Sequence, residues 1–182
     1  MSSAPDPTPL LLGGAATEAE RRRTPEVFER NINVKVIRPG DDRVQVLASF
    51  LDLEHSFDAE MLVHVPSGRI EHAKAHMAKR PFQTLCLRAL DNIGRLEGEV
   101  IGRGIYRRIT DLIGKNTGCV HLAEIFQAAV GFTATLLIAL RYGLSEKPVI
   151  NEDESRRNLL PVLQDTCQVF RVDEPAGTAH KG

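Results

Sequence analysis

A cysteine and a histidine two residues apart, Cys119 and His121, are the first candidates for chemistry in this chain. They follow Asn116-Thr117-Gly118, where Asn116 or Thr117 can cap a helix, so we expect Cys119 in the first turn of a long helix. Unpaired N–H groups there favour a thiolate or a bound anion. Glu124 lies one helical step beyond His121 and could orient its imidazole. The alternative is that Cys119 only packs in the core and His121 only hydrogen-bonds at a helix end.

A second cluster of polar residues surrounds the end of an apolar segment. Asp52 interrupts the apolar run Phe50–Leu53, and it is either a turn-forming residue or a buried acid with a chemical task. His55 and Asp58 follow and could form the acid–base pair that proton transfer requires. The alternative is a polar hairpin connection. Glu54 and Glu60 complete this acidic cluster.

Metal sites are a further possibility that the histidines and cysteines raise. Cys86, Cys119, His121 and Cys167 form a set of three cysteines and one histidine, but their wide spacing is unlike paired zinc motifs. His64, His72 and His76 could form a histidine patch, although a solvated strand face is the simpler explanation because no carboxylate or thiol joins them in a tight pattern. The glycines near residue 100 have the wrong spacing for a phosphate-binding loop, so no cofactor is expected.

Composition excludes several classes of protein. The chain has 182 residues, of which 42% are hydrophobic and 26% charged, and a net charge of −1. These values are ordinary for a globular domain and argue against nucleic-acid binding, which needs a concentrated basic surface. The apolar run 125–140 is shorter than the roughly 20 residues of a bilayer span, so no membrane partner is expected. With no signal peptide and an odd number of cysteines, a cytoplasmic location fits best.

Periodicity predicts the fold. Residues 1–24 are expected to be a disordered tail, 25–173 a single domain and 174–182 a flexible end. Apolar residues alternate with period two and then switch to helical spacing after Pro81, which suits the first position of a helix. Strands are expected around 32–36, 44–50, 61–65 and 69–76, helices at 81–96, 105–113 and 118–142, and a last strand at 168–172. This order predicts an α+β fold: an antiparallel meander followed by a three-helix layer on one face.

Several short motifs resemble those of a family of small bacterial proteins catalogued as a domain of unknown function. The motifs are Arg80-Pro81-Phe82 with Cys86, and the box Gly118-Cys119-Val120-His121-Leu122, which is Gly-Cys-Thr-His-Leu in the family. Val120 replaces the usual threonine. Phe57-Asp58 stands where the family has His-Asp, which leaves His55 as the nearest histidine. The resemblance covers about residues 30–172, with weaker matches at Leu96, Gly104, Asp52 and Cys167. Members of the family often accompany genes for breaking down aromatic compounds.

Three functions follow as hypotheses. The first is a small cofactor-independent enzyme, a lyase more than a hydrolase, that acts by acid–base chemistry on an aromatic, lignin-type phenolic compound. Its candidate residues are His121, Cys119, Asp52, His55, Asp58 and Glu124. The second is a metal or iron–sulfur protein that uses the cysteine set. The third is a non-enzymatic binding module, and assembly into a homo-oligomer is left open.

Overall fold

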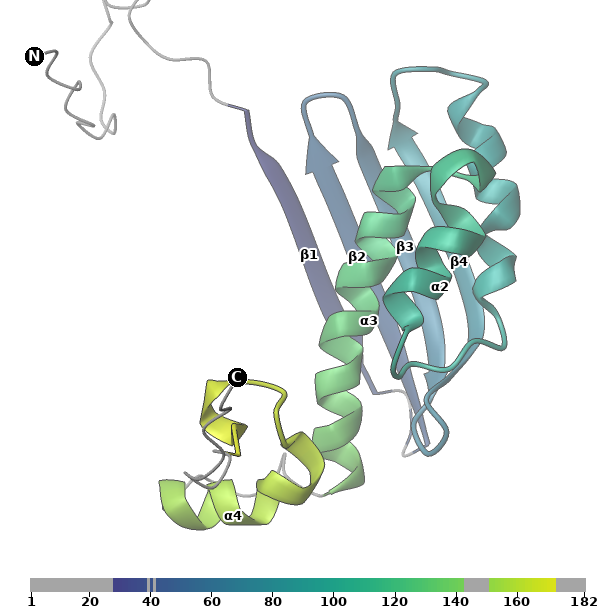
Figure 1. The fold of residues 1–182 in the computed structure, drawn as a ribbon. Coiled ribbons are helices and arrows are strands. Elements are labelled where there is room, and N and C mark those ends of the chain that lie inside the picture. The colour runs from purple at the N-terminus through teal and green to yellow at the C-terminus, as the bar shows by residue number, and fades with distance from the viewer. Residues whose placement is uncertain (1–27, 39, 41, 143–150, 173–182) are drawn as a thin grey trace, which may run out of the picture.

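The computed structural model describes residues 28–38, 40, 42–142 and 151–172. The predicted tail, residues 1–24, and the predicted flexible end, residues 174–182, lie outside these ranges. Four strands form one antiparallel sheet in the order β1-β2-β3-β4 (Figure 1). They are β1 (Arg30–Ile37), β2 (Arg43–Asp52), β3 (Ser56–His64) and β4 (Arg69–Lys79). The predicted meander is confirmed.

The alternation of apolar and polar residues decides which face of the sheet is covered. Along β2 and β3, every second side chain is buried, because successive side chains in a strand point to opposite faces. Phe50 pairs with Phe57 across the hairpin, and their rings stack 5.7 Å apart. The buried face therefore carries the apolar core, and the opposite face carries polar side chains.

Helices cover the buried face of the sheet (Figure 1). The elements are the 3-10 helix η1 (Cys86–Leu96), α2 (Ile105–Ile113), the short 3-10 helix η2 (Lys115–Thr117) and α3 (Val120–Arg141). The expectation that Pro81 begins the first helix is wrong. The Arg80 guanidinium donates to the carbonyls of Met77 and Gln83, which holds this segment in a turn before η1 begins.

The C-terminal segment differs from its prediction. The described residues contain four helices of nine residues or more, not three, because α4 (Glu152–Leu163) follows α3. Asn151 caps α4 by accepting hydrogen bonds from the N–H groups of Asp153 and Glu154. The strand expected at 168–172 is instead the 3-10 helix η4 (Gln168–Phe170), because Arg156 binds the backbone carbonyls of Val169 and Arg171. In Figure 1, α4 lies beyond the end of α3, away from the sheet.

The longest helix, α3, is apolar enough to cross a membrane and also packs on the sheet. By length and composition it is the one helix in the described ranges that could cross a membrane. One side of it packs on the sheet, where Leu122, Phe126 and Val130 are completely buried. Such packing is typical of the core helix of a globular domain.

Candidate active site

The end of β2, the β2–β3 connection and the start of α3 meet at one end of the sheet. They bring together Asp52, His55 and His121, which offer one ligand or acid–base atom each within 4.8 Å of one another. The two imidazole rings lie 4.1 Å apart between centroids. Phe50 and Phe57 approach the His121 ring edge-on, at 5.5 and 6.4 Å. The three polar groups therefore stand against an aromatic wall.

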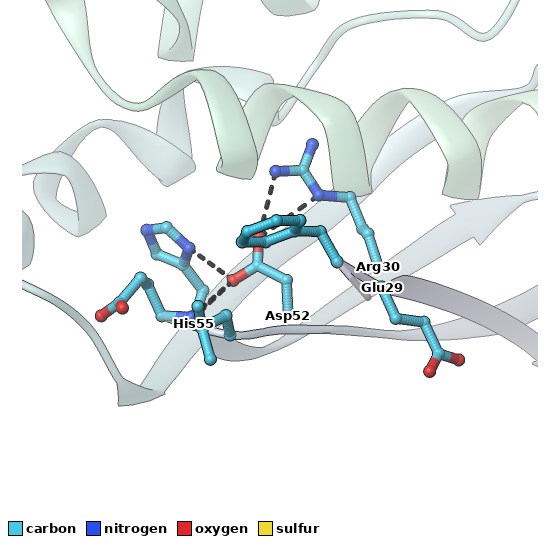
Figure 2. A pocket seen from close by; sticks show the side chains of 7 residues that line it. Glu29, Arg30, Asp52 and His55 are labelled. Carbon is cyan, nitrogen blue, oxygen red and sulfur yellow. Dashed lines mark hydrogen bonds and ion pairs between the residues drawn. The ribbon is translucent and has the colours of Figure 1, made fainter. Parts of the chain in front are cut away.

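Asp52 is held by five hydrogen bonds. Its Oδ1 accepts from the backbone N–H groups of Glu54 (3.0 Å) and His55 (2.9 Å) and lies 2.8 Å from His55 Nδ1. Its Oδ2 accepts from Arg30 at 3.0 and 3.3 Å (Figure 2). Burial alone would raise the pKa of Asp52, but these hydrogen bonds outweigh it and hold the pKa well below its usual range. Asp52 is therefore a charged acceptor that orients His55.

The orientation of His55 decides which nitrogen is free. A carboxylate facing Nδ1 requires the proton on that nitrogen, which leaves the lone pair or second proton on Nε2 for other chemistry. The side chains of Asp52 and His55 are each only 12% exposed, so water competes little for this bond. The pair has the geometry of an imidazole positioned by an acid.

Arg30 links β1 to this pair and to α3. Besides Asp52, its guanidinium binds Glu124 Oε2 at 2.9 Å, and it lies over the Phe50 ring at 4.9 Å from the centroid. The predicted role of Glu124 as the partner of His121 is therefore replaced: Glu124 instead holds Arg30. Sequence reasoning missed Arg30. The signal was available, because Arg30 shares the period-two face of Ile32, Val34 and Val36, where a charge is unexpected.

His121 is the second imidazole of the site. Burial lowers its pKa, and the nearby charges of His55 and Arg30 lower it further, against smaller opposing contributions from Asp52 and Glu124. This lowering of the pKa favours the neutral form of the His121 ring. Its Nδ1 lies 3.8 Å from Cys119 Sγ, within reach of a weak S–H hydrogen bond.

The start of α3 has a different cap from the one predicted. Cys119 is the N-cap residue, without a side-chain cap hydrogen bond, because Asn116 and Thr117 belong to η2. The Cys119 N–H donates to the Ile113 carbonyl at 2.8 Å. Gly118 permits this close approach, since a Cβ there would lie 2.0 Å from that carbonyl oxygen. The Gly118-Cys119 step thus anchors α3 to the end of α2 and sets the position of His121.

A pocket of about 520 Å³ opens beside the Asp52–His55 pair (Figure 2). Its walls come from the start of β1 and the β2–β3 connection: Phe28, Glu29, Arg30, Asp52, Leu53, Glu54 and His55. Phe28 and Leu53 are 75% and 64% exposed, so they offer apolar surface to a ligand next to the polar groups.

Asp58 does not join this group. It is exposed on the polar face of β3, opposite Ser49 of β2 and His76 of β4. The predicted acid–base pair of His55 and Asp58 is therefore wrong in geometry, and Asp52 takes the place of Asp58. Glu60 lies on the same polar face and pairs with Lys74 at 2.8 Å.

The predicted cysteine set does not converge. Among the described residues, the one group of three or more histidine, cysteine or acidic residues that could hold a metal ion is Asp52, His55 and His121. Cys86 and Cys119 line a different pocket, of about 380 Å³, and Cys167 is exposed before η4. The histidines of the possible patch also have separate partners: His64 binds Ser67 and His72 binds Glu97.

The converging trio is a poor metal site in its present arrangement. Both oxygens of Asp52 already accept hydrogen bonds, and the Arg30 guanidinium occupies the position beside Oδ2. A cation would have to displace Arg30 or His55 from this carboxylate, and its charge would oppose that of Arg30. The hydrogen bonds instead favour proton transfer as the chemistry of these residues.

Comparison with known families identifies the relatives of the chain. The model of a family described as protein of unknown function, DUF2889, matches residues 28–134. The chain belongs to this family. The DUF2889 match begins just before β1 and ends within α3, so it contains Arg30, Asp52, His55 and His121 and excludes α4. No curated protein and no solved structure matches the chain.

Proposed function

We propose that this protein is a small cofactor-independent enzyme in which His55 and His121 carry out acid–base chemistry, most simply a lyase. The observation that carries the proposal is the pair of imidazoles 4.1 Å apart, of which Asp52 binds only one. Two imidazoles this close resist double protonation, because a charge on one ring opposes a charge on the other. One ring can then act as the acid and the other as the base.

The environment supports an assignment of the two roles. The lowered pKa of His121 makes it the neutral ring and thus the base. The Asp52 carboxylate holds the Nδ1 side of His55 at 2.8 Å and leaves Nε2 for the substrate, and we therefore assign His55 as the acid. Asp52 and Arg30 are positioning residues in this proposal, and Glu124 positions Arg30.

A retro-aldol cleavage suits this pair. His121 takes the proton of a substrate hydroxyl, and the O–H electron pair forms a carbonyl. The neighbouring C–C bond breaks, its electrons pass to the departing carbon, and His55 protonates that carbon from Nε2. The reaction consumes no redox equivalent, and the proton returns from His121 to His55 through the solvent. General acid–base groups of this kind contribute roughly 100- to 10,000-fold each.

An aromatic substrate is the class we propose. The apolar surface of Phe28 and Leu53 lies on the pocket wall beside the polar groups, and the Phe50 and Phe57 rings back the imidazoles. A planar ring can pack on such a wall while its hydroxyl side chain reaches the histidines. The proposed link of the family with genes for breaking down aromatic, lignin-type compounds points to the same class.

Cys119 allows a second mechanism at the same place. Its thiol lies 3.8 Å from His121, so His121 could take the thiol proton and leave a nucleophile for hydrolysis. The two mechanisms make different predictions for Cys119→Ala. Activity within about threefold of the parent is expected for the lyase, whereas a loss as large as that of His121→Ala would favour the hydrolase.

The experiment is a product analysis with phenolic compounds that carry a β-hydroxyl group. The parent protein should release an aldehyde, and in deuterated water the other product should carry deuterium on the carbon that His55 protonates. The His121→Ala and His55→Ala variants should be inactive in the same assay. The proposal is overturned if the parent converts none of the compounds or if both variants match it.

Metal analysis distinguishes the remaining alternative. We expect less than about one equivalent of zinc or iron in the purified protein, because the Asp52 oxygens are occupied by hydrogen bonds. Stoichiometric metal that is lost in His121→Ala would instead assign Asp52, His55 and His121 as ligands. Metal lost in Cys86→Ser would favour the cysteine set.

A further inference from the structure

The two edges of the sheet differ in how they are covered. The start of β4 is paired with the backbone of residues 98–101, through Ile70 N–H to Glu99 O at 2.9 Å and Gly98 N–H to Ile70 O at 2.8 Å. Along the outer edge of β1, no described residue forms a strand pairing. An open edge presents a row of N–H and C=O groups with which another strand can pair.

β1 carries Arg30 and Lys35, but it lacks two other features that usually protect such an edge, a bulge and a proline. Its register with β2 is continuous over eight residue pairs, without a bulge, and it contains no proline. Its inward side chains Ile32, Val34 and Val36 are only half-buried, whereas Val44 and Val46 on β2 are 0% and 1% exposed. The edge strand therefore leaves apolar surface uncovered on the helix side of the sheet.

The helix above this edge is also incompletely covered. α3 is apolar on nearly all sides, yet only 44% of its most apolar stretch is buried. A helix of this composition is expected to be covered on most sides. On the side that begins with His121, Ala128, Phe132, Leu136 and Ala139 follow at helical spacing; none of them is buried, and Phe132 is 50% exposed.

The ion pair between Arg30 and Glu124 shows which part of α3 lies next to the start of β1. The two elements run in the same direction (Figure 1). Val34 is four residues beyond Arg30, about 13 Å at roughly 3.3 Å per strand residue. The same distance along a helix is about nine residues at roughly 1.5 Å each, which reaches from Glu124 to Thr133. Phe132 thus lies level with Val34, the centre of the open edge.

We propose that the edge of β1 and the adjoining flank of α3 bind a second copy of this chain, with a two-fold axis at Val34. Antiparallel pairing of two identical strands about this residue places Ile32 opposite the partner's Val36 and Val34 opposite the partner's Val34. On the polar face, Asn33 meets the partner's Lys35. A register centred on Lys35 would instead oppose two lysines, which is unfavourable.

The same symmetry covers the flank of α3. Both helix layers lie on one side of the joined sheet, and strands are about 4.8 Å apart. A helix seated over β1 and β2 then has the partner's helix roughly 10–13 Å away, slightly more than the 8–10 Å of packed helices. Large side chains fill such a gap, and Phe132 lies at its centre. At the ends, Arg30 approaches the partner's Arg38, and two carboxylates already bind Arg30.

The pairing also has a consequence for the pocket. Because the two strands are antiparallel, the end of the partner's β1 lies beside Phe28 and Arg30, which form one wall of the pocket. The second copy therefore narrows the pocket mouth. The proposal itself rests on the edge and the helix flank, and it holds whatever reaction the site performs.

Sedimentation velocity of the full chain tests the proposal. The parent is expected to be a dimer at micromolar concentrations. Phe132→Glu should raise the dissociation constant by about tenfold or more, because it places two carboxylates at the axis. The matched control is Phe82→Glu, at a phenylalanine 62% exposed before η1, which should leave the dimer unchanged. Circular dichroism confirms that both variants are folded.

A cysteine at the axis locates the contact directly. In a Cys167→Ser background, Val34→Cys should form a disulfide-linked dimer under mild oxidation, whereas Gln45→Cys, one strand further in, should not. A monomeric parent, or a dimer that Phe132→Glu does not weaken and Val34→Cys does not cross-link, overturns the proposal. A monomer that binds vesicles of anionic lipid also overturns it and assigns the surface to a membrane.

Discussion

Two groups of histidine and carboxylate side chains lie on opposite faces of the same sheet. On the helix side, Asp52, His55 and His121 are enclosed between β2 and α3. On the other side, a groove of about 330 Å³ contains Asp58, Glu60, Lys74 and His76. Each group has an acid and an imidazole with a cation beside them, Arg30 on the helix side and Lys74 on the other, so residue types alone do not distinguish them. The two groups differ in enclosure, because the helix that covers the first group removes water and fixes its hydrogen bonds.

The enclosed group has a defined partner for each charge. Asp52 accepts five hydrogen bonds, and burial is the largest influence on the pKa of His121. In the open groove the main contact is the Glu60–Lys74 ion pair, and Lys74 is 60% exposed. The pKa of Glu60 is lowered chiefly by that hydrogen bond. The comparison supports the proposed proton transfer on the enclosed face, whereas the other face is a solvated strand surface.

The largest expected effect is on activity. His121→Ala should lower turnover by about 100-fold or more, the usual contribution of one positioned proton-transfer group. His76→Ala, in the open groove, is the matched control and should remain within about twofold of the parent. Steady-state kinetics with thermal melting of each variant checks this. Equal losses at the two histidines would remove the distinction between the two faces.

The next effect is on stability at the start of α3. Gly118→Ala should destabilise the protein by roughly 1–3 kcal/mol, because the added Cβ meets the Ile113 carbonyl and displaces the helix start. Gly102→Ala is the control: a Cβ there has no atom within 4 Å, and we expect a change within about 0.5 kcal/mol. Urea unfolding measures both. A stable Gly118→Ala variant would show that α3 can shift without cost.

A smaller effect concerns pH. The pKa of His121 is lowered in the folded state from 6.5, so below about pH 6.5 the unfolded chain binds more protons than the folded one. The free energy of unfolding should therefore fall as the pH decreases from 6.5 through the folded pKa. Above pH 6.5 the ring is neutral in both states, so His121 should no longer lower the stability. His121→Gln should flatten this part of the profile. An unchanged slope in His121→Gln, measured by chemical unfolding between pH 5 and 7, would contradict the proposed burial of the ring.

The smallest effect is expected in the open groove. Lys74→Ala removes the ion pair with Glu60, but an exposed pair contributes only about 0–1 kcal/mol. We expect a change in unfolding free energy at the low end of this range, reduced further by salt. A loss above 2 kcal/mol would mean that the polar face is covered in solution.

Much of the fold and part of the site could be predicted from the sequence. The switch from period-two to helical spacing located the meander and the helices, since burial on one face imposes that periodicity on any sequence. The sequence also singled out Asp52, His55 and His121 by residue type and position, and the structure brings these three within 4.8 Å of one another. Residues 168–172 were assigned wrongly, because a short apolar segment lacks a distinctive period and Arg156 fixes its backbone from outside.

Only the tertiary structure decided which acid serves the histidines. Along one strand, residues of equal parity share a face, but the β2–β3 connection shifts this parity: Phe50 pairs with Phe57, so Asp52 points to the covered face and Asp58 to the open one. The alternation carries this change of parity, with even-numbered residues buried on β2 and odd-numbered residues on β3, but it does not show that Asp52 and His55 approach His121. Arg30 and His121 likewise come from distant segments, and their approach depends on how α3 crosses the sheet. The sequence determined the chemistry available, and packing determined which groups could use it together.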